Sequence, residues 1–165
     1  MRIVVSAIVA MLALPIAAFA DPSTAPDYTA ADQVQFAKLG AANGRWQCTD
    51  TPASEKPDVI TGKQLGNWYL WRESGDDPST TYVRWVHGLK SYVQNEIDAS
   101  GTTEIYTTTS PDPFNGTWKP AYPPRGGGLY PIKYTFADGT MTASGKYKDR
   151  KTHQVLTFKA VCTKL

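Results

Sequence analysis

Residues that could do chemistry are few and widely spaced in this sequence. The two histidines, His87 and His153, have no partner at metal-site spacing, and the chain carries no His-x-His, HExxH or CxxC motif. No serine lies in the sequence context of a nucleophile elbow. We therefore expect no metal site, no catalytic residue at these positions and no cofactor.

One pair of carboxylates keeps an enzymatic alternative open. Glu96 and Asp98 are two residues apart, so they share one face of a predicted strand, and His87 lies at the end of the preceding strand. Paired carboxylates or a histidine can serve as general acid and base. A barrel isomerase or hydrolase acting on a hydrophobic substrate through His87 or Glu96 is thus one hypothesis, but a solvated strand face explains the pair more simply, so an enzyme is disfavoured.

The first twenty residues have the pattern of a secretory signal. Arg2 precedes an apolar run that ends in Ala18-Phe19-Ala20, a small-residue cleavage pattern. No other stretch is long and apolar enough to span a bilayer. We expect cleavage after Ala20, a secreted or periplasmic location, no membrane insertion after cleavage, a flexible lead-in at 21–28 and a single domain over 29–165.

The charge of the exported chain is nearly balanced. The whole sequence has 17 Lys and Arg against 15 Asp and Glu, so removal of Arg2 leaves 16 against 15. A balance this close to zero favours neither nucleic acid nor a membrane surface as a partner.

The two cysteines are predicted to form a disulfide. Export to an oxidising compartment favours pairing of Cys48 with Cys162. The bridge would close a loop on the order of 100 residues, which stabilises the fold by up to roughly 4.7 kcal/mol in the chain-entropy model.

Local patterns predict one short helix followed by antiparallel strands. Thr29 and Asp32 resemble a capping box, the apolar residues Val34, Phe36 and Leu39 could share a helical face, and Gly40 or Gly44 ends the helix. Alternating, aromatic-rich segments then predict about eight strands joined mainly by short hairpins. We expect these strands near 44–50, 58–72, 80–88, 90–98, 102–109, 129–137, 140–148 and 154–163.

Residues 110–128 interrupt the strand pattern. This segment holds five prolines and four glycines. A loop of this length is unusual in a compact domain. We expect it to be a lid over the barrel mouth, a segment that contacts a protein partner, or disordered.

The start of the first predicted strand carries a family resemblance. A short helix followed by Gly44-x-Trp46 and an up-and-down β meander resembles the calycin group, above all the lipocalin-like bacterial domains. The resemblance implies a closed barrel whose end is plugged by Trp46, with a basic residue late in the chain, Lys159 or Lys164, capping the indole. First and last strands are neighbours in such a barrel, which is the geometry that a Cys48–Cys162 bridge requires.

Aromatic side chains alternate onto both faces of several predicted strands, and the sequence does not decide which face points inward. A filled core, a ligand cavity and a protein-binding face could each explain them. We expect an exported protein that binds a small hydrophobic or amphipathic ligand, or alternatively an envelope or extracellular module that contacts proteins through the Pro-rich loop and exposed aromatics. The candidate ligand-lining residues are Tyr69, Trp71, Trp85, Tyr92 and Tyr134 on strands, with Trp118 and Tyr122 approaching from the 110–128 loop.

Overall fold

The computed structural model describes residues 28–76, 78–122, 129–149 and 152–165. The predicted signal at 1–20 and all of the lead-in except Tyr28 lie outside these residues. Within the described part, no helix has the length and apolar character needed to cross a membrane.

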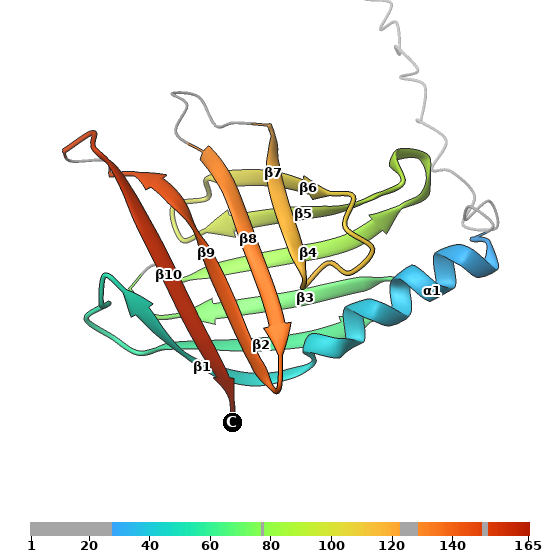
Figure 1. The fold of residues 1–165 in the computed structure, drawn as a ribbon, viewed down its shortest axis with the longest axis horizontal. Coiled ribbons are helices and arrows are strands. Elements are labelled where there is room, and N and C mark those ends of the chain that lie inside the picture. Colours follow the sequence, from blue (N-terminus) through green and yellow to red (C-terminus); the bar gives the residue numbers. More distant parts are fainter. Residues whose placement is uncertain (1–27, 77, 123–128, 150–151) are drawn as a thin grey trace, which may run out of the picture.

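The chain folds as a closed, antiparallel up-and-down barrel (Figure 1). Each strand pairs with its neighbours in sequence, and the first strand also pairs with the last. The predicted mainly β class and the barrel closure are confirmed. The strands are β1 Gly44–Thr51, β2 Asp58–Leu65, β3 Trp68–Ser74, β4 Ser79–Val86, β5 Ser91–Asp98, β6 Thr103–Thr108, β7 Gly116–Tyr122, β8 Leu129–Ala137, β9 Thr140–Lys148 and β10 Val155–Lys164.

The barrel has ten strands, so the prediction of about eight was wrong. The segment 58–72 is two strands, because Gly66 adopts a φ of 59° and reverses the chain in a tight turn that places Leu65 opposite Trp68. The second additional strand is β7, which lies inside the Pro- and Gly-rich segment that was predicted to be a loop. Pro120 is accommodated next to a register shift between β6 and β7.

The predicted N-terminal helix is present as α1, Ala30–Leu39, and a short 3₁₀ helix, η2 Gly40–Ala42, follows it. Thr29 and Asp32 form the expected capping box: the Thr29 backbone N–H donates to Asp32 Oδ2 at 2.9 Å, and the Asp32 N–H donates to Thr29 Oγ1 at 3.3 Å. Phe36 and Leu39 are buried, whereas Val34 is 57% exposed, so the expected three-residue apolar face is only partly correct.

Strands β1 and β10 close the barrel and carry the disulfide. Cys48 pairs directly with Cys162 across the two strands, and their sulfur atoms are bonded at 2.07 Å. The predicted bridge is confirmed.

Helix α1 and the residues before β7 cover one end of the barrel, which we call the closed end. Lys38 Nζ donates to the Pro111 carbonyl at 2.7 Å, and Gln64 Nε2 donates to the Phe36 carbonyl at 2.9 Å. Pro113 and Phe114 are buried there. Residues 110–122 therefore pack at the closed end or form β7. The rest of the predicted loop, 123–128, lies outside the described residues.

Candidate functional site

Trp46 fills the closed end of the barrel. Its side chain is only 1% exposed, its Nε1–H donates to the Ala42 carbonyl at 3.1 Å, and Phe136 packs against it edge-on. Tyr69 donates its hydroxyl to the same Ala42 carbonyl at 2.7 Å. The 3₁₀ turn thus fixes both rings through one acceptor.

A lysine covers the outer side of this indole. Lys164 Nζ lies 5.6 Å from the Trp46 ring centroid, a cation–π distance. Gly44, at a φ of 141°, leaves room for it, since a Cβ there would stand 2.7 Å from Lys164 Cε. Lys159, the other candidate, is exposed on β10. Lys164 is therefore the residue that sits where the resemblance expected a basic cap.

Apart from Tyr122, the predicted ligand-lining aromatics face the interior, and most of them are already held by contacts within the protein. Tyr92 donates its hydroxyl to Gln35, Trp118 donates to the Pro113 carbonyl, and Trp85 donates to Asp32. Trp71 packs edge-on against Tyr134, and its Nε1–H is buried without a partner. Tyr122 lies in β7, opposite Ile105, and its side chain lies outside the described residues.

The space between these aromatics is too narrow for a ligand. Trp71, Phe114, Trp118 and Tyr134 leave, with their neighbours, a space of about 180 Å³ that is too narrow to hold a water molecule. The closed half of the barrel is therefore a packed core.

The opposite end of the barrel, which we call the open end, is lined by carboxylates. Residues that lie directly opposite each other in a ladder face the same side of the sheet. Asp58 pairs with buried Cys48, Glu73 with buried Ile60, and Glu96 with buried Thr81. By the same rule, every Asp and Glu in the ten described strands faces inward. These residues are Asp50, Asp58, Glu73, Glu96, Asp98 and Glu104.

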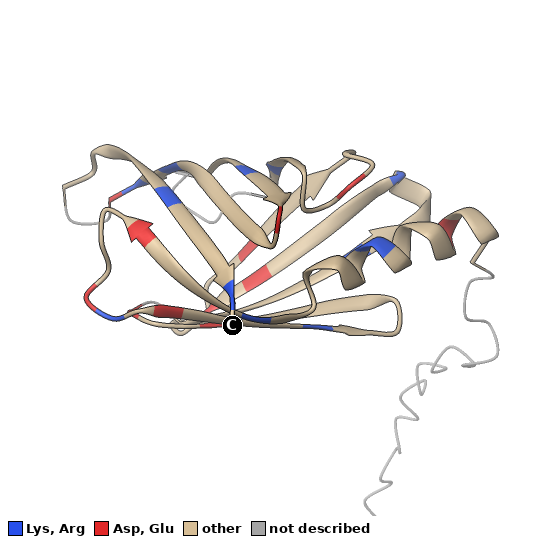
Figure 2. Cartoon of the chain, turned by 60° about the horizontal axis from the view of Figure 1, so that its bottom comes forward, with Lys and Arg blue, Asp and Glu red and all other residues tan. Residues whose placement is uncertain are grey.

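Basic residues of the strands have the opposite arrangement. Among the described strands, Lys164 is the one Lys or Arg on an inward position, and it lies at the closed end over Trp46. Figure 2 shows the acidic strand positions toward the side of the barrel away from α1. We call the six inward carboxylates at the open end, which lie on β1, β2, β3, β5 and β6, the acidic ring. The basic residues of the strands, apart from Lys164, face solvent.

The carboxylates at the open end change the pKa values of neighbouring groups. Burial, a hydrogen bond to the Asp50 carboxyl and the charges of Asp50 and Asp76 together raise the pKa of Asp58 to about 7, against the lowering effect of Ser54. Burial and the carboxylates of Glu104 and Glu96 raise the pKa of the Tyr106 phenol above its ordinary value, and Tyr106 donates to Glu104 Oε2 at 3.1 Å.

The carboxylates also affect Tyr134, which lies on β8 across the barrel from them. Burial raises the pKa of its phenol, and the charges of Glu96 and Glu73 raise it further. A positive charge brought to this end would relieve the repulsion that these groups share.

Near the same end, the wall over β8, β9 and β10 carries an open depression of about 500 Å³. Gly145 lets its neighbours approach the backbone of β9 closely, since a Cβ there would come within 2.8 Å of the Phe158 ring and 3.0 Å of the Pro131 carbonyl. The depression is lined by Tyr130, Pro131, Ser144, Gly145, Lys146, Thr157 and Phe158.

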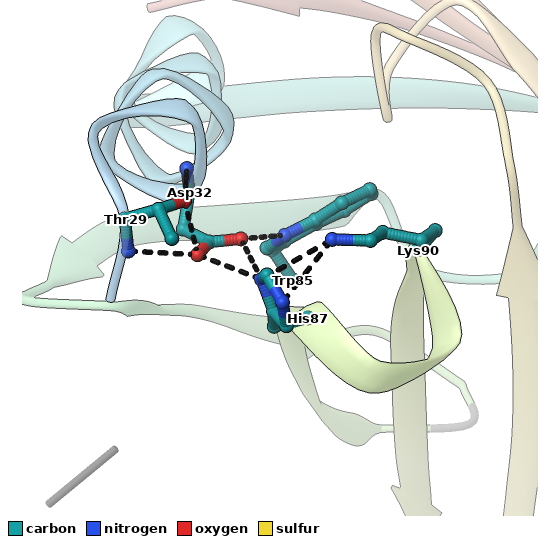
Figure 3. A network of polar contacts seen from close by, with 5 residues as sticks. All are labelled: Thr29, Asp32, Trp85, His87 and Lys90. Atoms are coloured by element: carbon teal, nitrogen blue, oxygen red, sulfur yellow. Dashed lines mark hydrogen bonds and ion pairs between the residues drawn. The ribbon is translucent and has the colours of Figure 1, made fainter. Parts of the chain in front are cut away.

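His87, the histidine of the enzyme hypothesis, belongs to a separate polar network at the N-terminus of α1 (Figure 3). Its Nδ1 lies 2.9 Å from both oxygens of Asp32, and Trp85 Nε1 donates to Asp32 Oδ1 at 2.7 Å. Burial raises the pKa of Asp32, but the hydrogen bonds from His87, Thr29 and Trp85 outweigh it, so the pKa lies well below its usual value. The ionised carboxylate only accepts, so Nδ1 of His87 carries the proton.

The structure does not bring His87 and Glu96 together. His87 follows β4 at the closed end, whereas Glu96 faces the interior toward the open end of β5. His153 lies in the turn before β10, in an exposed position. In the part of the chain that the structure describes, no three His, Cys, Asp or Glu side chains are grouped so that they could hold a metal ion.

The sequence reasoning missed the acidic ring, although a signal for it exists. Glu73 lies an even number of positions from Tyr69 and Trp71 in the same strand, and Glu104 lies two positions before Tyr106. Once one aromatic of a strand is placed inside, the carboxylate two residues away must face inward as well.

Fold and site together define a closed up-and-down β-barrel with a packed aromatic half and an acidic open end. In comparisons with known proteins, no family model matches the chain, and no match was found among curated proteins.

Proposed function

We propose that this protein is an exported binding protein that holds a small amphipathic molecule at the open end of its barrel, with a positively charged group of that molecule among the inward carboxylates. Because the aromatic half is filled, the ligand stays at the open end and does not reach Trp46. This proposal keeps the expected lipocalin-like role and adds the charge of the ligand.

One observation carries the proposal: all six carboxylates of the described strands face into the barrel at one end. Carboxylates gathered at one end of a barrel attract a cation, and the raised pKa of Asp58 beside Asp50 is a sign of their mutual repulsion. The apolar part of the ligand would pack against the aromatic residues of the barrel interior nearest the carboxylates, such as Tyr106, which donates to Glu104, and Tyr134.

Export is part of the proposal. The leader pattern at 1–20 supports it, and so does the disulfide, because such bridges persist in oxidising compartments.

Binding can be tested with three amphiphiles of equal chain length and different charge: dodecyltrimethylammonium, dodecyl maltoside and dodecyl sulfate, each below its micellar concentration. Isothermal titration calorimetry should give the tightest binding for the cation. The variant Glu96→Gln/Glu104→Gln should weaken cation binding about tenfold or more, because each lost charge–charge contact near a protein surface is of the order of 1 kcal/mol or more.

Glu55→Gln provides the matched control, since Glu55 is exposed in the β1–β2 connection and outside the ring. It should leave binding unchanged. Equal affinity for all three amphiphiles, or no heat with any of them, would contradict the proposal.

A further inference from the structure

The outer surface of β2 to β5 differs from the rest of the barrel wall. These strands lie side by side as one layer of the barrel (Figure 1). Their outward residues form three cross-strand rows, which we call the apolar–basic patch. The rows are Leu65, Trp68, Arg84 and Val93; then Lys63, Leu70, Tyr82 and Asn95; then Thr61, Arg72, Thr80 and Ile97.

Large apolar side chains in this patch are exposed to solvent. Leu65 is 49% exposed, Trp68 42%, Tyr82 38% and Ile97 37%. Trp68 and Tyr82 meet edge-on with 6.4 Å between their ring centroids. The Arg84 guanidinium carbon lies 4.7 Å from the Trp68 ring centroid, so a cation and two amphipathic rings form one continuous surface.

The charge of the patch is of one sign. Lys63, Arg72 and Arg84 are exposed on it. Strands β2 to β5 are described over their whole length, and each of their four carboxylates, Asp58 among them, faces the barrel interior. The patch therefore carries three cations and no anion.

The opposite wall lacks this combination. The outward positions of β9 and β10 hold mainly Thr, Ser and Lys, such as Thr142, Ser144 and Lys159. That wall is basic without exposed aromatic residues. The near-neutral formal charge of the whole chain does not favour a membrane surface as a partner. That sum does not describe the strand wall, where the basic residues face outward and the carboxylates face inward.

We propose that the apolar–basic patch docks on the surface of an anionic phospholipid bilayer. Trp and Tyr are the aromatic residues enriched at the membrane–water interface, where one end of the ring is apolar and the other is wet. Lys and Arg beside them are attracted by anionic headgroups. Three such cations strengthen binding to an anionic surface by roughly a hundredfold over a neutral one. This inference does not depend on a ligand at the open end.

Sedimentation with vesicles tests the proposal. The mature protein is mixed with vesicles of phosphatidylcholine alone or of 70% phosphatidylcholine and 30% phosphatidylglycerol, in about 50 mM and about 500 mM NaCl. Binding is expected to the phosphatidylglycerol vesicles in low salt, with a large loss in high salt, because ions screen surface charge.

Variants distinguish binding through the apolar–basic patch from binding through basic residues elsewhere on the barrel. Trp68→Ala and Arg84→Gln should each reduce the vesicle partition coefficient about fivefold or more, while Lys133→Gln and Lys159→Gln on the opposite wall should reduce it less than twofold. Far-ultraviolet circular dichroism confirms that each variant is folded, and Arg72→Gln replaces any variant that is not.

Two results would overturn the proposal. One is absence of binding to the phosphatidylglycerol vesicles in low salt. The other is equal loss in patch and control variants. Analytical ultracentrifugation is run in parallel: a dimer that Trp68→Ala converts to a monomer, without vesicle binding by the wild type, would assign the patch to self-association instead.

Discussion

Trp46 and Asp58 both face the inside of the barrel, yet they meet different surroundings. Trp46 is buried among apolar groups, and a carbonyl satisfies its N–H. Asp58 shares its site with the carboxyl of Asp50, which accepts a hydrogen bond from Ser54 Oγ at 2.6 Å. The indole therefore stabilises the fold at any pH, whereas the contribution of Asp58 depends on its protonation.

At the residue scale we predict a pH-dependent cost at Asp58. An unfolded aspartate has a pKa of about 3.9, and in the folded barrel the pKa of Asp58 is raised to about 7. Between these values the folded protein holds a proton that the unfolded chain has released, so this site lowers the free energy of unfolding as the pH rises from about 4 to about 7. Asp58→Asn removes that dependence.

Urea unfolding at about pH 4.5 and about pH 8 measures the effect. The stability difference between Asp58→Asn and wild type should shift in favour of the variant at the higher pH. Glu55→Gln, which removes an exposed carboxylate, should show no such shift. A variant whose stability followed the wild type across this range would mean that Asp58 does not retain its proton.

Helix α1 acts as an element that closes the barrel. Leu39 is fully buried, Gln35 accepts from Tyr92, and the Phe36 carbonyl accepts from Gln64. Asp32 joins the N-terminus of the helix to the end of β4. The free energy that holds the helix thus comes from one buried side and several polar contacts with the strand ends.

At the element scale we predict that Leu39→Ala lowers the free energy of unfolding by about 2 to 5 kcal/mol, because it leaves a cavity between α1 and the barrel. Val34→Ala on the same helix should change it by less than about 0.5 kcal/mol, since Val34 is 57% exposed. Denaturant unfolding followed by tryptophan fluorescence gives both values. Similar costs for the two variants would show that α1 is not docked through Leu39.

The elements differ in how well local sequence defines them. The capping box at Thr29 and the turn at Asp138-Gly139 carry their own signals, and both are present. The turn at Gly66 was missed because strand-forming residues flank it closely on both sides. Strand β7 was missed because Pro120 and the neighbouring glycines are rare in strands, and only pairing with β6 and β8 makes the segment extended.

The candidate site was harder to predict than the fold. Alternation shows that Glu96 and Asp98 share a face, but the side of the sheet that becomes the interior depends on closure of all ten strands. Which aromatics line free space depends on packing among residues far apart in sequence, such as Trp71 and Tyr134. Local sequence patterns therefore predict neither the inward face of the sheet nor the aromatic residues that line free space.

At the scale of the whole molecule, the disulfide ties the two ends of the strand order together. It joins residues 114 positions apart across the β1–β10 ladder. We predict that reduction lowers the free energy of unfolding by about 2 to 5 kcal/mol, mainly because the unfolded chain regains loop entropy. The backbone pairs between β1 and β10 remain, so the reduced protein should still fold as a barrel.

Guanidinium unfolding with and without dithiothreitol checks this prediction. A Cys48→Ala/Cys162→Ala variant should match the reduced wild type and should not respond to the reductant. If reduction left the unfolding midpoint unchanged, the bridge would be a consequence of folding that adds nothing to stability.

The sorting of charge in the ten strands means that a titration curve and retention on a charged resin report different things about this molecule. Protons that exchange with the inward carboxylates change the total charge, while a resin that contacts the strand wall meets lysines and arginines there and acidic residues only in the connections, such as Glu55 and Asp138. On a cation exchanger near neutral pH, the protein should therefore elute later than another of its size and isoelectric point whose charges are evenly mixed.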